Sequence, residues 1–197
     1  MKFRQTLIAA LVTMGVGMST ANADTGSLTF TWSGKVPFDT VTPTGWKFVD
    51  IGGVNDYIPT AGTFNIKKAD ATSYSAEGTH MQFKLVPKTV SKTFDNAGVK
   101  ARIAAAPTIV GAAPNSAIEL ASTSSGCATN TAICVFPMIN GNIVTDEDTV
   151  VQTTSAGDTK VDMDLVMDFT APVASLVQGN TIALTSTFII TADISNP

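Results

Sequence analysis

Residues 27–37 read Ser-Leu-Thr-Phe-Thr-Trp-Ser-Gly-Lys-Val-Pro, a stretch in which apolar and polar residues alternate. Because successive side chains of a β-strand point to opposite sides, one face would carry Leu28, Phe30, Trp32, Gly34 and Val36. The other face would carry hydroxyl side chains and one lysine. The pattern therefore predicts a β-strand with one apolar face, which must be buried either in its own domain or in a second copy of the protein.

The first 23 residues have the three zones of a secretory signal. Two basic residues lie among the first four, an apolar run follows over residues 7–18, and residues 21–23 read Ala-Asn-Ala, a small-x-small cleavage site. The apolar run is shorter than the roughly 20 residues that a membrane-spanning helix needs. We expect residues 1–23 to be a signal peptide and the mature chain to begin at Asp24.

Removal of this segment would leave 174 of the 197 residues, enough for one domain with a full hydrophobic core. Two of the 12 basic residues would be lost and all 16 acidic residues kept, which gives a mature net charge of −6. Such a balance argues against a nucleic-acid partner, since proteins that bind phosphate backbones concentrate positive charge.

The pattern of the chain is that of an all-β protein. No long window repeats apolar residues at helical spacing, and many short alternating runs are bounded by Gly, Pro, Asn, Asp or Ser. Such spacing without intervening helices predicts a β-sandwich with antiparallel and Greek-key pairing. After the opening stretch, the predicted strands are 46–51, 63–67, 81–86, 99–104, 116–121, 133–139, 149–154, 159–170 and 180–194, with a less regular crossing over 104–113.

Two of these strands have a clear register. Between Val161 and Phe169 every second residue is apolar, and these residues should face the core, with Asp162, Asp164 and Asp168 facing water. In the last strand one face carries Ile182, Leu184, Phe188, Ile190, Ala192 and Ile194, and threonines dominate the other.

The two cysteines, Cys127 and Cys134, are seven residues apart in a chain expected to reach an oxidising compartment. We expect them to form a disulfide that closes a small loop. The spacing is not that of a Cys-x-x-Cys redox motif.

Residues for catalysis or metal binding are scarce. His80 is the sole histidine, and there is no Gly-x-Ser-x-Gly turn, so a Ser-His-Asp site is not expected. Asp162 and Asp164 could form a carboxylate pair, but their strand face also fits plain solvent exposure. Residues 146–148, Asp-Glu-Asp, lack the spaced ligands and turn glycine of a calcium loop. The sequence predicts no enzyme, no catalytic residues, no metal site and no cofactor.

The chain resembles the major pilins of chaperone–usher fimbriae, above all the coli surface antigen type of colonization-factor subunits. The resemblance is carried by the export signal, by the opening run Leu28-x-Phe30-x-Trp32-x-Gly34-x-Val36-Pro37, by the run Trp46-x-Phe48-Val49, and by the alternating last strand. It covers about the first third of the mature chain, and the remainder only by length and pattern.

This resemblance implies an immunoglobulin-like sandwich that is incomplete in one subunit and is completed by a donor strand from a neighbouring subunit. It implies a donor-strand extension over residues 24–37 and a pilin domain over residues 38–197. Within the extension, Leu28, Phe30, Trp32 and Val36 would fill the acceptor groove, and Gly34 would lie where the groove has no room for a side chain.

The function implied by the resemblance is that of a structural subunit of a surface fimbrium, exported through the periplasm, which mediates adhesion to host surfaces. Its partners would be further copies of itself, a periplasmic chaperone, an outer-membrane usher and a host glycan or glycoprotein receptor. Two alternatives stay open. The chain could be a single-domain adhesin, a minor or tip subunit that binds a glycan or protein, or a self-complete secreted β-sandwich that uses the opening strand in its own sheet.

Overall fold

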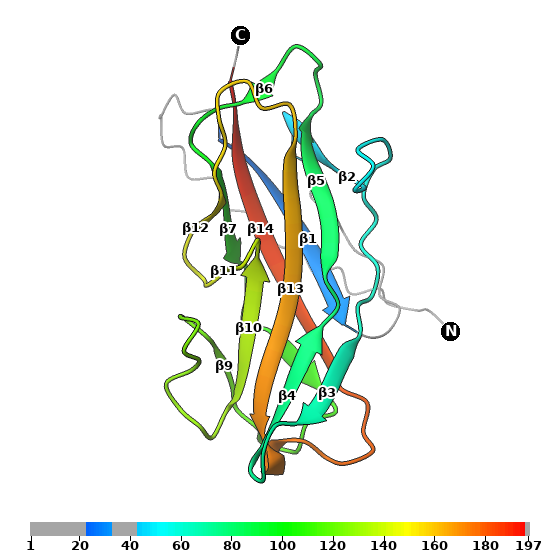
Figure 1. Ribbon diagram of the computed structural model, residues 1–197, viewed down its shortest axis with the longest axis vertical. Helices are drawn as coiled ribbons and strands as arrows, with labels where there is room; N and C mark the ends of the chain where they lie inside the picture. The colour runs from blue at the N-terminus through cyan, green and yellow to red at the C-terminus, as the bar shows by residue number, and fades with distance from the viewer. Residues whose placement is uncertain (1–22, 33–42, 196–197) are drawn as a thin grey trace, which may run out of the picture.

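The computed structural model describes residues 23–32 and 43–195, and these residues form two β-sheets (Figure 1). The first sheet has the order β1-β14-β7-β12, and β6 and β8 also pair with β14. Its strands are β1 (Ala23–Trp32), β6 (Thr93–Phe94), β7 (Val99–Ile103), β8 (Thr108–Val110), β12 (Thr149–Gln152) and β14 (Ala183–Ser195).

The second sheet is built around β13. It has the order β11-β10-β13-β4-β3, with β5 also on β13, β2 on β5 and β9 on β10. Its strands are β2 (Trp46–Val49), β3 (Phe64–Lys68), β4 (Ser73–Gly78), β5 (Met81–Pro87), β9 (Ile118–Leu120), β10 (Ile133–Ile139), β11 (Asn142–Ile143) and β13 (Val161–Pro172). A short 3-10 helix, Val173–Ser175, follows β13. All pairs among these strands are antiparallel except β9 with β10.

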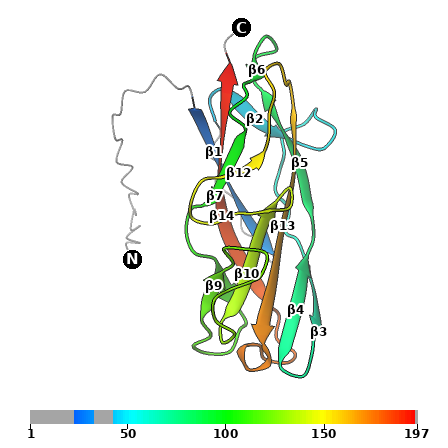
Figure 2. The ribbon, with the colours of Figure 1, turned by 60° about the vertical axis from the view of Figure 1, so that its left-hand side comes forward.

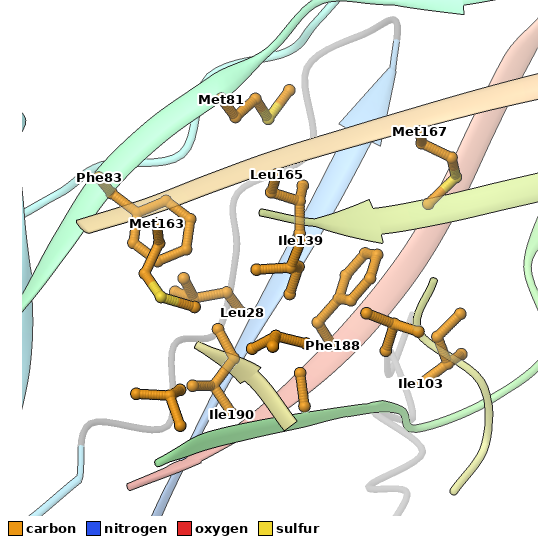
Figure 3. Packing of buried hydrophobic residues seen from close by; sticks show 14 of the residues in the cluster. Leu28, Met81, Phe83, Ile103, Ile139, Met163, Leu165, Met167, Phe188 and Ile190 are labelled. Carbon is orange, nitrogen blue, oxygen red and sulfur yellow. The ribbon is translucent and has the colours of Figure 1, made fainter. Parts of the chain in front are cut away.

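The two sheets share one hydrophobic core, an arrangement consistent with a β-sandwich. Figure 2 shows β7 and β14 on one side of the molecule and β3, β4 and β5 on the other. The close view in Figure 3 shows Phe188 and Ile190 of the first sheet approaching Met163, Leu165 and Ile139 of the second. These five side chains belong to one cluster of buried residues and are at most 2% exposed.

The alternation predicted for the two longest strands is confirmed. In β13, Val161, Met163, Leu165, Met167 and Phe169 are all buried, whereas Asp162, Asp164 and Asp168 are exposed or half-buried. In β14 the even-numbered residues from 184 to 194 are buried and the intervening residues are half-buried. Each strand thus contributes one face to the core, because the side-chain period of a strand is two.

Several predicted strand bounds are confirmed closely, and two differ in an informative way. The predicted strand 133–139 has the bounds of β10, whereas β1 begins at Ala23, four residues before the predicted start. Strand β4 was not predicted. Its sequence, Ser-Tyr-Ser-Ala-Glu-Gly, buries only Ala76 and therefore lacks the apolar alternation that identifies other strands.

The predicted disulfide is confirmed: Cys127 and Cys134 are bonded, with their Cα atoms 5.7 Å apart. The bond ties a short surface loop to the start of β10. In the chain-entropy account, so small a ring removes about 2.5 kcal/mol of unfolded-state freedom.

We predict that replacing Cys127 and Cys134 together by alanine lowers the free energy of unfolding by about 2 kcal/mol, because only this loop-closure term is lost. Urea denaturation followed by fluorescence should show a lower midpoint with an unchanged slope. A loss of the cooperative transition would instead show that the bond is needed for the whole fold.

Candidate assembly strand

The N-terminal strand β1 lies at the edge of the first sheet. It pairs antiparallel with β14 over ten residue pairs, from Ala23 opposite Asp193 to Trp32 opposite Leu184. Among the described strands, β14 is its sole hydrogen-bonded neighbour. Figures 1 and 2 both show β1 running beside β14, so the first described strand of the chain lies against the last. In the single chain, the opening strand is therefore used in its own sheet.

Leu28 anchors β1 in the core. Its side chain is fully buried, and its position lies directly opposite Phe188. Figure 3 shows Leu28 between the sheets, close to Met163 and Ile190. Burying a leucine side chain stabilises a fold by about 1.5–3 kcal/mol relative to leaving it exposed. The apolar face predicted from the sequence is thus confirmed at Leu28.

Gly26, on the same face as Leu28, permits a close contact between β1 and the segment that leads into the second sheet. A Cβ atom at this position would lie 2.6 Å from Pro43 Cγ and 2.9 Å from the distal Cη2 of Trp46. Trp46 is fully buried and stacks edge-on against Phe48, with ring centroids 4.9 Å apart. Because nothing larger than glycine fits without a shift, Gly26 sets how closely β1 approaches this cluster.

Gly26 was not predicted as a contact point from the sequence. The resemblance to pilins implies the close-approach role for Gly34, which lies with Val36 outside the described residues. The sequence places Gly26 two residues before Leu28, and therefore on the same strand face. Strand alternation alone does not predict that this glycine contacts a tryptophan.

The backbone register places the next two predicted residues along the same row of β14. Phe30 lies opposite Ser186 and Trp32 lies opposite Leu184. Ser186 is 3% exposed, and its hydroxyl has no hydrogen-bond partner among the described residues. A small side chain therefore interrupts the otherwise apolar row of buried residues on β14 at the position that faces Phe30 in the register.

At its other end, β1 begins opposite a carboxylate. Asp193 lies opposite Ala23, the last residue of the predicted signal peptide. Its Oδ1 atom is buried and has no hydrogen-bond partner among the described residues. Burial raises the pKa of Asp193, the neighbouring Asp95 raises it further, and Lys100 lowers it. The predicted cleavage point thus coincides with the first residue pair of the ladder; residues 1–22 lie outside the described part of the chain.

The chain between β1 and β2 is long enough to place β1 elsewhere. Trp32 ends β1, whereas Pro43 packs against Gly26, six residues back along the strand. Six strand residues span about 20 Å, and the 11 residue steps from Trp32 to Pro43 can span roughly 36 Å when extended. The connection can therefore return along β1 within one chain or reach away from it.

The other polar residues considered from the sequence lie apart from this strand. Nδ1 of His80, a residue with 62% of its side chain exposed, lies at hydrogen-bond distance from Asp164 Oδ1, 2.9 Å, and Lys84 approaches Asp162 at 3.5 Å. Asp148 lies 3.5 Å from Arg102. Within residues 23–32 and 43–195, no three His, Cys, Asp or Glu side chains gather so as to hold a metal ion. The same residues contain no helix of the length and apolarity required to cross a membrane.

Comparison of the chain with models of protein families, with curated proteins and with solved structures found no match. The geometry of β1 against β14 is therefore the main observation from which a function can be argued.

We predict that Gly26→Val displaces β1, because its Cβ would overlap Pro43 and Trp46. Native-state hydrogen exchange should show faster exchange of β1 amides than in the wild-type chain, by about tenfold or more, which corresponds to roughly 1.4 kcal/mol of local stability. Thr25→Val is the matched control, since Thr25 is exposed on the opposite face. Equal protection of β1 in the two variants would contradict the close-approach role.

Proposed function

We propose that this chain is an exported fimbrial subunit that polymerises by donating its N-terminal strand to the next copy, and that the resulting fibre mediates adhesion to host surfaces. One observation carries the proposal. The edge strand β1 lies at the start of the predicted mature chain, and its Leu28 is buried in a core that is otherwise built by residues 43–195. A connection of 10 residues (33–42) joins β1 to those residues.

Removal of β1 would leave a groove of the kind that accepts a strand. Leu184, Phe188 and Ile190 on β14 are fully buried in the presence of β1, and a row of backbone groups on β14 pairs with it. An uncovered sheet edge with an apolar floor is a template for strand addition. The backbone ladder gives affinity, and the alternate side chains give register.

The same pairing can form within one chain or between two chains. Exchange of an identical element between protomers preserves its contacts, so the two states differ mainly in the connection and in association entropy. Donation from head to tail is heterologous and does not have to close, so it yields a filament. In this proposal, residues 24–37 form the donor segment. The contact of Leu28 with the core of the acceptor subunit is extended by Phe30, Trp32, Gly34 and Val36.

Intramolecular pairing has the advantage of a high effective concentration. A polymer therefore needs its acceptor groove to stay open until a second copy arrives. In the family that the sequence resembles, a periplasmic chaperone performs this task and an outer-membrane usher delivers the subunit. We infer the same two partners here, together with export directed by residues 1–23.

A self-complete secreted β-sandwich is the second candidate, and the pairing of β1 with β14 in the single chain favours it. The two candidates differ in whether β1 leaves its own domain when many copies are present with a chaperone.

We predict that the mature chain, residues 24–197, produced with its cognate chaperone gives detergent-resistant ladders on unboiled gels, and that deletion of residues 24–36 removes them. Leu28→Asp should also remove them, because an unpaired carboxylate in an apolar groove is strongly unfavourable. Thr25→Asp, on the exposed face of the same strand, should keep them.

Co-purification with the chaperone serves as the control for folding of each variant. Ladders of wild-type yield from Leu28→Asp would contradict the proposal. A stable wild-type monomer that is unfolded by the deletion would favour the self-complete sandwich.

A further inference from the structure

The outer face of the second sheet carries two adjoining hollows, with volumes of about 630 Å³ and 340 Å³. Phe136 of β10 and Thr170 of β13 line both of them, so the two hollows meet at these residues, and we refer to the pair as the groove. The groove lies over β4, β10 and β13; in Figure 1, β4 and β10 are in the lower part of the molecule, on either side of the lower part of β13. Its larger part has the size of a small-molecule site, about 300–1,000 Å³.

Strand alternation and the disulfide together build this groove. In β10, Val135 is fully buried and Phe136 is half-buried, which places the Phe136 ring on the outer face. The bond between Cys127 and Cys134 holds the preceding loop beside that ring. A Cβ atom on Gly126 of this loop would lie 3.8 Å from Phe136 Cζ. The loop therefore forms one wall of the groove, with an aromatic ring at its base.

The opposite wall contains a fixed carboxylate. Asp70 accepts hydrogen bonds from the backbone and hydroxyl of Thr72, at 2.7 and 2.8 Å, and from the backbone and hydroxyl of Ser73, at 2.9 and 2.8 Å. These bonds, the Thr72 backbone first, lower the pKa of Asp70 to about 2. The turn is thus held in one conformation and carries a negative charge at any physiological pH.

Several polar groups of the groove have no protein partner. The amide of Asn130 and the hydroxyls of Ser125 and Thr170 make no hydrogen bond to other described side chains or backbone groups. They are free to bind a ligand, and each can act as donor or acceptor.

The charge of the groove limits the class of ligand. Its charged residues are Asp70, Glu77 and Asp168, and none of the described residues that line it is a lysine, arginine or histidine. Lys67 forms an ion pair with Glu77, at 2.5 Å, from the neighbouring strand. A phosphate, sulfate or sialic acid would meet carboxylates without a matching cation, and like charges repel. The hydroxyl and amide groups also disfavour an alkyl chain, because they would be buried without partners.

We propose that this groove binds an uncharged oligosaccharide. The free hydroxyl and amide groups match sugar hydroxyls, and the electron-rich face of Phe136 suits the C–H face of a sugar ring. The site deepens the proposed adhesive function by naming its ligand class. The groove lies on the second sheet, whereas β1 pairs in the first, so β1 does not line the groove whether it is kept or donated. A fibre would then repeat the site along its length and gain avidity.

The test uses the mature monomer labelled with ¹⁵N. The probes are neutral tri- to hexasaccharides of galactose, glucose, mannose and N-acetylhexosamines, with a sialylated form of each. We expect at least one neutral member to shift the amides of residues 124–136 and 168–172, and its sialylated form to bind more weakly. Phe136→Ala should weaken that binding about tenfold, and Asn130→Ala should also weaken it. Asn96→Ala is the matched control, an exposed asparagine in the loop between β6 and β7, away from the groove, and should bind as the wild-type chain does.

Tighter binding of a sialylated probe than of its neutral form would overturn the inference, as would shifts confined to other surfaces or no shift at 10 mM of any neutral probe. Thermal unfolding of each variant separates lost binding from lost folding. The test is made on the monomer, so the two proposals can fail independently. Absence of saccharide binding would not contradict assembly by strand donation, and absence of polymerisation would not contradict saccharide binding.

Discussion

The pairing of β1 with β14 is the interaction on which the account depends. Ten residue pairs join the first described strand of the chain to the last, and Leu28 enters the core beside Phe188. Without β1, the inward row of β14 would lose its cover on that side. The hydrophobic core lies between two sheets, and one of its residues, Leu28, comes from β1, an edge strand at the start of the predicted mature protein.

In the proposed assembly, a stable monomer and a polymer are two outcomes of the same contacts. Leu28 and Gly26 fit the space beside Phe188, Pro43 and Trp46 whichever copy provides β1. The connection of 10 residues after Trp32 is long enough for both routes. Under the proposal, the choice between monomer and polymer depends on the order of export, the presence of a chaperone and the local concentration of subunits. No residue of β1 lines the groove on the second sheet, so the proposed binding role is compatible with either outcome.

Much of the fold follows from period-two patterning. The alternation of β13 and β14 identifies their buried faces, because each strand has one face on the core and one outside it. The disulfide follows from two nearby cysteines and the expected compartment. In contrast, β4 is largely polar and could not be recognised, and Gly26 could not be identified as a contact point before Trp46 was seen against it. The groove around Phe136 depends on a loop from one part of the chain meeting strands from two others, which local sequence patterns do not encode.

The most direct measurement is a cysteine cross-link across the ladder. Thr25 lies opposite Thr191, and directly opposed strand residues have Cα atoms about 4.5–5.5 Å apart, within reach of a disulfide. Subunits that carry only Thr25→Cys would be assembled with subunits that carry only Thr191→Cys. In the control mixture, the second kind of subunit would carry Thr187→Cys instead, which is four residues out of register. If β1 is donated between subunits, non-reducing denaturing gels should show a disulfide-linked dimer for the first mixture and none for the control. No dimer from the first mixture, together with an internal cross-link in a chain that carries both substitutions, would show that β1 stays in its own domain and would contradict donation between subunits.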